Sequence, residues 1–391
     1  MPPEPGALGG VRALVLDPDS HVSLAACRAL GRAGAVAEVG GHRFAGIAER
    51  SRFVRTTHPL PDVRGPAAPY AEALRTLIDR RKIDVVVTTD DATIARLDSI
   101  DLAVATVPGL GAARRSLVDK AADGLPKLCA SSGVAYPETW TVPATSDGRD
   151  LVAAALPAVV KARTSARATA DTVACARGAT TVDSVDRGMG KIARLRARGL
   201  EPIVQRRIAK GRKLGVVLLR REGTLEIAYA HVVLREYPPS GGRAAAVRTA
   251  RRDDHGAIEA IGLCDRVCAA AGYDGVIHAE LLEHAGGITL IELNPRLSGT
   301  TWFREQLGLR PTERAVRVAL GLPALPPAGV PVGRTFHVLP LEARFATRSP
   351  RRSRLRALGW WRPGDRVDGI SLTDPWPTVS HYAGRLSRDD Q

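Results

Sequence analysis

Short apolar runs alternate with amphipathic stretches along the first hundred residues. Residues 12–16, 35–39 and 83–87 have the length and composition of buried strands. Between them, one helix is expected from the turn at Asp17 to Ala33, where Gly34 ends it, and another over residues 70–81. This alternation predicts a doubly wound parallel sheet. The first turn is not a G-x-G-x-x-G loop, so the fingerprint of dinucleotide binding is missing.

After residue 111 the pattern changes to shorter strands with fewer helices. A helical stretch over 112–132 precedes a strand over 158–161, whose expected partner is the run 172–175. Later elements are expected at 203–204, 228–236 and 244–250 (strands) and at 257–271 (a helix closed by Gly272).

These patterns predict three parts. An N-terminal α/β domain covers 1–111, a second domain covers 112–330 and divides into 112–206 and 207–330, and an extension covers 331–391. The extension carries Trp360, Trp361 and Trp376. Aromatic residues are depleted in disordered segments, so we expect it to pack on the body of the protein.

Composition favours a cytoplasmic globular protein. Hydrophobic residues make up 45% of the chain and charged residues 25%. No apolar run approaches the roughly 18 residues that span a bilayer, and the first residues do not resemble a secretory signal. The five cysteines are odd in number and scattered. Cys264 and Cys268 lie one helical turn apart on an apolar stripe, which favours buried thiols over a metal or redox pair.

The net charge of +15 raises the question of nucleic-acid binding. Residues 191–252 hold 16 Lys and Arg against four Asp and Glu, so most of the excess lies in one stretch. No nucleic-acid recognition motif accompanies it. We therefore expect this stretch to serve an anionic small molecule, with no nucleic-acid or membrane partner.

The most informative segment reads as two apolar strands, 276–284 and 288–294, around a Gly-Gly turn. If His284 pairs with Ile288, then Glu280 lies opposite Glu292, and Asn294 shares their face. Two opposed carboxylates repel each other, and a bound Mg²⁺ or Mn²⁺ would remove that conflict. Pairing Glu283 with Ile288 instead would put the glutamates on opposite faces. The residues alone leave both a cation site and a solvated face open, and they favour a packing role for His278.

Several segments in order resemble the ATP-grasp ligases, close to the carbamoyl-phosphate-synthase type. Glu280 with the run from Ile291 to Arg296 is similar to that family's metal-binding signature. Lys120 and Lys161 resemble its two phosphate lysines, residues 204–208 its adenine hinge, and residues 234–242 a loop of its carboxylate–amine branch. The resemblance implies an ATP-grasp fold behind an α/β domain, with the nucleotide between two α+β subdomains.

The resemblance also implies roles for single residues. Glu280, Glu292 and Asn294 would hold two Mg²⁺ ions, and Lys120 and Lys161 would contact the phosphates of ATP. Gln205, Arg206, Arg207 and Ile208 would meet adenine, the last three around the hinge backbone. Arg296 and Arg248 would stabilise the transferred phosphoryl group, and Arg235, Ser240 and Arg248 would contact the carboxylate substrate. An acyl phosphate would then react with an amine. Whether the chain forms a homodimer is left open.

Two departures from the family pattern leave an alternative open. The segment over the phosphates, residues 162–171, contains no glycine, although Arg163 or Arg167 could add charge there. Where an acidic residue normally meets the ribose, this chain has Arg212 and Lys213. The alternative is a non-catalytic nucleotide- or metabolite-binding protein on the same fold.

Overall fold

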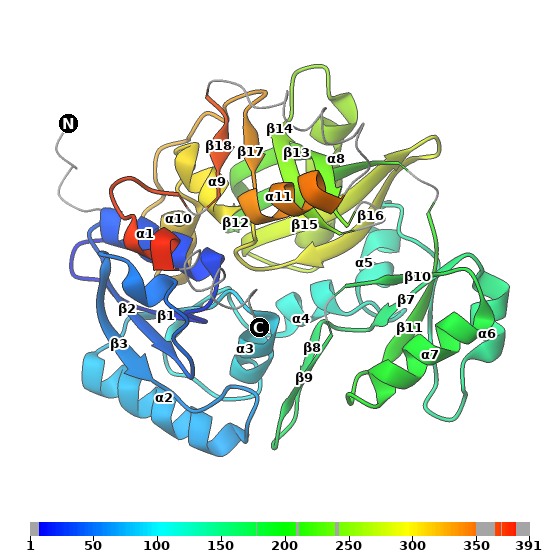
Figure 1. The fold of residues 1–391 in the computed structure, drawn as a ribbon, viewed down its shortest axis with the longest axis horizontal. Helices are drawn as coiled ribbons and strands as arrows, with labels where there is room; N and C mark the ends of the chain where they lie inside the picture. Colours follow the sequence, from blue (N-terminus) through cyan, green and yellow to red (C-terminus); the bar gives the residue numbers. More distant parts are fainter. Residues whose placement is uncertain are drawn as a thin grey trace.

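The computed structural model describes residues 8–176, 178–208, 211–238, 242–348, 364–368 and 370–380. Figure 1 shows an N-terminal α/β unit beside a large sheet, with a smaller sheet at the opposite end. Within the described ranges, the strands form three sheets and one separate hairpin. We call the sheets the N-terminal, small and large sheets. Ser240, Trp360 and Trp361 lie outside the described residues.

The N-terminal sheet is parallel, with strand order β3-β2-β1-β4-β5. The predicted doubly wound sheet is therefore confirmed. Ser20 caps the first helix through its side chain, and Gly34 follows the helix with a φ of +87°. The elements are β1 (Arg12–Leu16), α1 (His21–Arg32), β2 (Val36–Gly41), η1 (Ala48–Arg50), β3 (Val54–Pro59), α2 (Ala67–Arg81), β4 (Val85–Val87), α3 (Asp91–Leu97) and β5 (Ala105–Val107).

Two short helices lead into the small sheet, whose strand order is β10-β7-β11-β6. The single helical stretch expected over 112–132 is wrong, because the chain leaves the helix at Asp119 and starts a new one after Gly124. The elements are α4 (Ala112–Val118), α5 (Leu125–Ser131), β6 (Thr139–Thr141), α6 (Arg149–Ala155), β7 (Ala158–Ala162), β8 (Ala166–Ala168), β9 (Val173–Cys175), β10 (Thr180–Val182), α7 (Val185–Arg196) and β11 (Pro202–Arg206).

The expected pairing of 158–161 with 172–175 is also wrong. In the structure β7 pairs with β10 and β11, whereas β9 pairs with β8 in the separate hairpin. Sequence patterns locate short strands, but they do not choose among several apolar partners.

The large sheet has strand order β16-β15-β12-β13-β14-β17-β18. Helix α8 covers one of its faces, where Cys264 and Cys268 are buried, as expected for structural thiols. The elements are β12 (Arg212–Arg221), β13 (Thr224–Tyr237), β14 (Arg243–Thr249), α8 (His255–Ala270), β15 (Gly275–His284), β16 (Gly287–Asn294), α9 (Thr301–Gln306), α10 (Pro311–Ala319), β17 (Thr335–His337), α11 (Leu339–Arg348) and β18 (Arg366–Val367).

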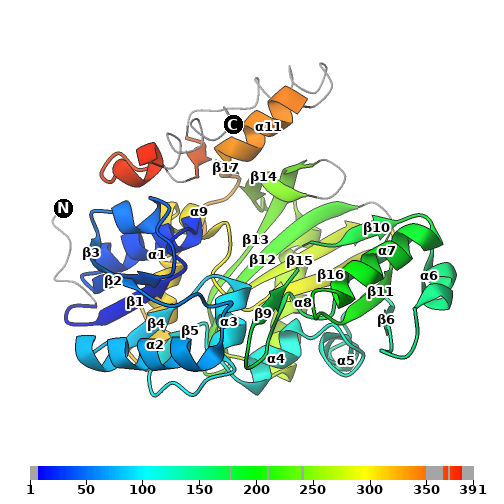
Figure 2. The same ribbon diagram turned by 60° about the horizontal axis from the view of Figure 1, so that its bottom comes forward.

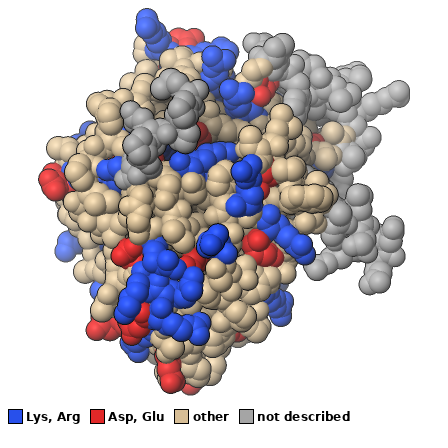
Figure 3. Space-filling model, turned by 90° about the vertical axis from the view of Figure 1, so that its left-hand side faces the viewer, with Lys and Arg blue, Asp and Glu red and all other residues tan. Residues whose placement is uncertain are grey.

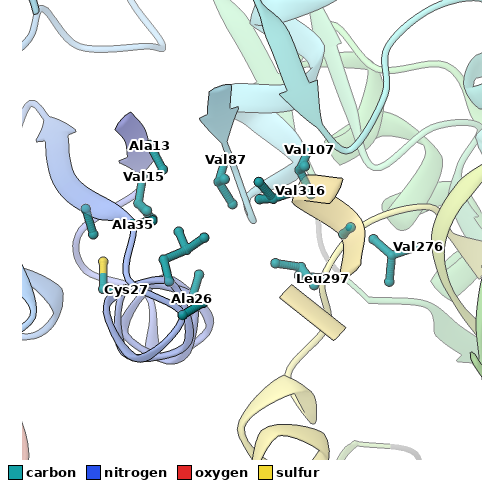
Figure 4. Packing of buried hydrophobic residues seen from close by; sticks show 14 of the residues in the cluster. Ala13, Val15, Ala26, Cys27, Ala35, Val87, Val107, Val276, Leu297 and Val316 are labelled. Carbon is teal, nitrogen blue, oxygen red and sulfur yellow. The ribbon is translucent and has the colours of Figure 1, made fainter. Parts of the chain in front are cut away.

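One hydrophobic cluster joins the N-terminal unit to the large sheet. Figure 4 shows Val87 and Val107 of the N-terminal sheet beside Val316 of α10, with Leu297 and Val276 on the other side. All five side chains are buried. The two units therefore share a core, and this fixes the N-terminal sheet next to the site described below.

Residues 370–380 lie against the N-terminal unit, far from them in sequence (Figure 2). Asp374 is buried there and accepts hydrogen bonds from the Arg28 Nε (2.8 Å) and the Ser51 hydroxyl (2.7 Å). Trp376, in contrast, is 67% exposed. Among the described residues, no helix is both long and apolar enough to cross a membrane.

Candidate active site

The two glutamates of the hairpin lie directly opposite each other, but not for the expected reason. The turn is tighter than predicted, because His284 pairs with Gly287 and Glu283 with Ile288. That register alone would separate Glu280 and Glu292 onto opposite faces. A β-bulge leaves Ile291 unpaired and shifts the register by one residue, so that Glu280 again pairs with Glu292 and His278 with Asn294.

The two carboxylates titrate in opposite directions. Desolvation by the surrounding protein and the charge of Glu292 raise the pKa of Glu280 to about 7, although the residue is exposed. Burial also opposes ionisation of Glu292, but Lys120, Lys161 and Arg296 together outweigh it and hold the pKa of Glu292 below its usual value. The Lys120 Nζ lies 3.1 Å from the Glu292 Oε1. At pH 7 the Glu292 carboxylate is therefore charged, whereas the Glu280 carboxyl is partly protonated.

Lys161 faces the same carboxylates from the small sheet. It lies on β7 and is buried, and burial lowers the pKa of its ammonium to about 8 against the attraction of Glu292 and Glu280. Two lysines from outside the large sheet therefore converge on two glutamates within it. This arrangement is suited to holding a polyanion together with a cation between the two sheets.

The donor atoms fit a hard divalent cation. Carboxylate oxygens of Glu280 and Glu292 and the amide of Asn294 are ligands of the kind that Mg²⁺ and Mn²⁺ prefer. Desolvation and the charge of Glu292 both raise the pKa of Glu280, and a bound cation would favour its charged form against both. In the part of the chain that the structure describes, no cluster of three or more His, Cys, Asp and Glu has the geometry of a metal site. The remaining ligand positions would fall to phosphate oxygens and water.

A cavity of about 340 Å³ adjoins this constellation. Lys120, Glu292 and Asn294 form part of its wall, and most of the rest comes from α3 and the residues just after it, α4, and the segment 163–168 that ends in β8. Arg163 also lines it and is held by Asp119, with 2.6 Å between Nε and Oδ1, and by Glu201, with 3.2 Å between Nη1 and Oε2. Most charges in this wall are already paired within the protein.

Arg296 is held by a residue that the sequence did not single out. Its Nε and Nη2 donate to the two carboxylate oxygens of Asp91 at 2.6 and 3.1 Å. Burial disfavours the charged guanidinium, but Asp91 outweighs that effect and raises the pKa of Arg296. Asp91 starts α3 in the N-terminal unit, 205 positions before Arg296. A fork of this kind fixes the plane of the guanidinium.

Asp17 in turn fixes the start of α3. Its backbone adopts a φ of +62°, and its carboxylate accepts hydrogen bonds from the Thr88 hydroxyl (2.7 Å) and from the amides of Thr89 (2.9 Å) and Asp90 (3.1 Å). Burial raises the pKa of Asp17. The sequence predicted a turn at Asp17, but it did not show that Asp17 adopts a left-handed backbone conformation or that its carboxylate binds the start of α3.

The expected adenine hinge lies on β11 and just beyond it. The Gln205 side chain is buried and donates to the Thr139 hydroxyl at 2.9 Å. Arg206 is exposed, with its Nε 2.9 Å from the Glu138 carboxylate, and its guanidinium lies over Trp140. The Arg207 amide donates to the Pro157 carbonyl at 3.3 Å, and Ile208 is half-buried. These four residues do not line the cavity described above.

The structure does not bring Arg235 and Arg248 to the carboxylates. Arg235 is buried against Glu342 of α11, with 3.0 Å between Nε and Oε2. Cross-strand pairs place Glu280, Gly215 and His231 on one face of the large sheet, and place Leu281, Leu214, Val232 and Arg248 on the other. There Arg248 lies 3.0 Å from Asp254. The expected contact of these arginines with a substrate therefore finds no support in the geometry.

His278 shares the carboxylate face, as predicted, and stacks on His231 with 5.8 Å between ring centroids. Burial lowers the pKa of both imidazoles, that of His231 to about 3, so both are neutral. Gly215 makes room for this pair, because a Cβ at that position would lie 2.2 Å from the His231 ring. The two stacked histidines are therefore uncharged neighbours of Glu280 on the same face of the large sheet.

Comparison with known proteins identifies the fold. No family model and no curated protein matches this sequence. An L-amino acid ligase from Bacillus licheniformis has a similar structure (TM-score 0.65, 15% identity, 84% of this chain and 79% of that one). So does an Aspergillus clavatus N5-carboxyaminoimidazole synthase solved with ADP and 5-aminoimidazole ribonucleotide (0.63, 16%, 83% and 80%).

A third similar structure is the biotin carboxylase domain dimer of a 2-oxoglutarate carboxylase from Hydrogenobacter thermophilus. It was solved with MgADP, ADP and bicarbonate, and it matches with a TM-score of 0.61 and 13% identity over 83% of this chain and 73% of that one. Likenesses at this level of identity identify a fold. In the arrangement of its sheets, the chain has the ATP-grasp fold.

Proposed function

We propose that this protein is an ATP-dependent ligase that joins a carboxylate to an amine and releases ADP and phosphate. The observation that carries the proposal is the convergence of Lys120 and Lys161 on Glu280 and Glu292, from different parts of the fold. Positioning and charge neutralisation are what phosphoryl transfer requires of a protein. The similar structures solved with ADP and MgADP support the choice of nucleotide and metal.

Each residue then has a task. Lys120 and Lys161 bind the phosphates of ATP. Glu280, Glu292 and Asn294 would hold Mg²⁺, which when bound would supply positive charge to neutralise the phosphate oxygens. Gln205 and the backbone of 206–208 lie at the adenine edge. Arg296, oriented by Asp91, stabilises the transferred phosphoryl group.

The reaction runs in two steps. A substrate carboxylate oxygen attacks the γ-phosphorus, and ADP leaves with the electron pair of the broken P–O bond. The amine then attacks the acyl carbon of the acyl phosphate, phosphate leaves, and the nitrogen gives up a proton. We assign no role in these steps to Arg235 and Arg248. A contact of Ser240 with the substrate, and a homodimer, stay predictions.

The first test is Glu292→Ala. It removes a metal oxygen and the partner of Lys120, so we expect kcat for ATP turnover to fall by roughly 10³-fold or more with the fold retained. A matched control is Glu283→Gln in the same hairpin, whose carboxylate pairs with Arg212 outside the constellation. Product formation from small acids and amines is followed by mass spectrometry, and folding by circular dichroism. Near-normal turnover in folded Glu292→Ala would contradict the metal assignment.

One alternative has its own support. The β8–β9 hairpin has no glycine, and Arg212, at the place expected for a ribose-binding acid, is tied to Glu283 and Asp254. Both features suit a protein that binds a nucleotide without turning it over. ATP binding measured by calorimetry, with no ADP released in the presence of any acid and amine pair, would favour this second function.

A further inference from the structure

The glycine-free segment forms a hairpin that is docked on the N-terminal unit. The Ala67 amide donates to the carbonyl of Ala170 at 2.7 Å, and the Thr172 hydroxyl donates to the carbonyl of Arg64 at 2.9 Å. The Val173 amide also reaches the Arg64 carbonyl, at 3.4 Å. Figure 1 shows β8 and β9 beside α3 and away from the small sheet, and Figure 2 also shows β9 beside α3.

One buried guanidinium lies at the centre of this contact. Arg96, on α3, is fully buried and donates from its Nη1 to the carbonyl of Thr169 in the hairpin at 2.7 Å. Its Nη2 donates to the carbonyl of Gly65 at 2.6 Å and its Nε to that of Val63 at 3.2 Å. Arg96 therefore joins the tip of the hairpin to the loop that precedes α2. Hydrogen bonds from a charged donor are among the stronger ones in proteins.

The docked hairpin closes the cavity on one side. Ser165, Ala166 and Ala168 line it, and so do Asp91 and Ala95 of α3. The helix that holds the hairpin through Arg96 thus also carries Asp91, the partner of Arg296. The positions of the hairpin and of Arg296 therefore both depend on α3.

We propose that Arg96 is a positioning residue that holds the β8–β9 hairpin over the cavity by docking it on the N-terminal unit. In this protein the cover of the site is fixed from outside by a guanidinium and backbone carbonyls, and it needs no glycine. The docking itself goes beyond the proposed function. Its effect on turnover rests on that function.

Amide hydrogen exchange on the full chain without ligand tests the docking directly. The amides of Ala67 and Val173 bond across the contact, so their exchange reports the undocked state. Arg96→Met should raise exchange in peptides that span these two residues by roughly tenfold or more. The control is Arg75→Met, which replaces an exposed arginine whose guanidinium also bonds to a carbonyl, that of Asp101, away from the hairpin. It should leave both amides within about twofold of the unmodified protein.

A second variant guards against loss of the fold in Arg96→Met. Ala67→Pro removes only the donor to Ala170. It is tolerated in α2, because proline suits the first helical position and Pro66 already has an extended ψ of 142°. Exchange at Val173 should rise in this variant too. If the proposed ligase reaction is found, the fraction of ATP hydrolysed without amide product should also rise.

Two results would overturn the proposal. One is unchanged protection of Val173 in both variants. The other is a rise in Arg96→Met spread evenly over the N-terminal unit while Val173 in Ala67→Pro stays protected, which would make Arg96 a support of the domain alone. Increased exchange at the contact without any ligase activity would uphold the docking and count only against the proposed function.

Discussion

Glu280 and Glu292 occupy equivalent positions on paired strands, yet their surroundings separate their protonation. Lys120 forms an ion pair with Glu292, and among the described residues it forms none with Glu280. Desolvation and the charge of Glu292 therefore raise the pKa of Glu280. The sequence could show that two acids share a face. It could not show which of them a lysine 172 positions away would select, because that choice depends on how α4 and α5 set Lys120 against β16.

This asymmetry predicts a pH dependence of metal binding. The pKa of Glu280 is raised to about 7, so without metal its carboxyl takes up a proton as the pH falls below 7. Mg²⁺ must then displace that proton, and its affinity should drop by up to about tenfold per pH unit between pH 7 and pH 5 while changing little above pH 8. Isothermal titration with MgCl₂ measures this.

Glu280→Gln is the control for that experiment. It cannot titrate, so it should bind Mg²⁺ weakly and without the pH dependence. An affinity that stays constant from pH 8 to pH 5 in the unmodified protein would show that Glu280 is not a ligand.

Asp91, Asp17 and Arg96 show where inference from the residues stops. Each acts on a group far along the chain, and each looks in the sequence like an ordinary charge at a helix or turn. The shared face of Glu280, Glu292 and Asn294 could be predicted because they lie on adjacent strands of one hairpin, in which side chains alternate between the two faces. The resemblance assigned Arg235 and Arg248 to the substrate, but their acidic partners are Glu342 of α11 and Asp254, which directly precedes α8.

At the scale of the elements, two features determine the register of the β15–β16 hairpin: the turn and the burial of its apolar side chains. The predicted loop was one residue too long, and the bulge at Ile291 compensates for it. Turn chemistry gives a local register, whereas burial of Leu290 and Leu293 against α8 decides which residues face the core. In a regular strand Leu290 and Leu293 would face opposite sides, so only the bulge at Ile291 lets both be buried while Glu292 lies opposite Glu280. That bulge was not predictable from the sequence.

The start of α8 makes a prediction about stability. Asp254 is buried, and burial raises its pKa, but the Arg251 amide and the guanidinium groups of Arg248 and Arg212 lower the pKa to about 2. A depressed pKa stabilises the folded state above pH 4, and that contribution is lost as the pH falls through about 2. Asp254→Asn should therefore lower the free energy of unfolding at pH 7 by about 1–2 kcal/mol.

Urea denaturation at several pH values checks this expectation. The difference between Asp254→Asn and the unmodified protein should narrow as the pH falls from 5 towards 2. Asp183→Asn, which loses an exposed pair with Arg187, should leave stability unchanged. A difference that is independent of pH would mean that packing at the start of α8, and not charge, holds these elements together.

At the scale of the whole molecule, many arginines of the basic stretch that suggested nucleic-acid binding form ion pairs within the protein. Arg212, Arg220, Arg221 and Arg235 each pair with an acidic residue of the protein. Figure 3 draws another part of the surface, the side of the N-terminal unit, where Lys and Arg also gather in patches bordered by Asp and Glu. Net charge is read directly from composition, but the pairing of that charge depends on the fold.

At the same scale, the contact of Asp374 with Arg28 predicts a large effect on stability. Both side chains are almost fully buried, and removal of one partner leaves the other charge poorly compensated in the core. Asp374→Ala should lower the free energy of unfolding by about 3–5 kcal/mol. The control is Trp376→Ala, two residues away and 67% exposed, which should stay within about 0.5 kcal/mol of the unmodified protein. Equal urea midpoints for the two variants would contradict this assignment.

This contact also has a consequence for how the chain is made. Arg28 and Asp374 are 346 positions apart. A ribosome that adds about 5–20 residues per second delivers Asp374 roughly 20–70 s after Arg28. Throughout that interval the first domain to emerge lacks a buried part of its own structure. The buried contacts of Arg28 with this segment can therefore form only after the segment that carries Asp374 has been synthesised.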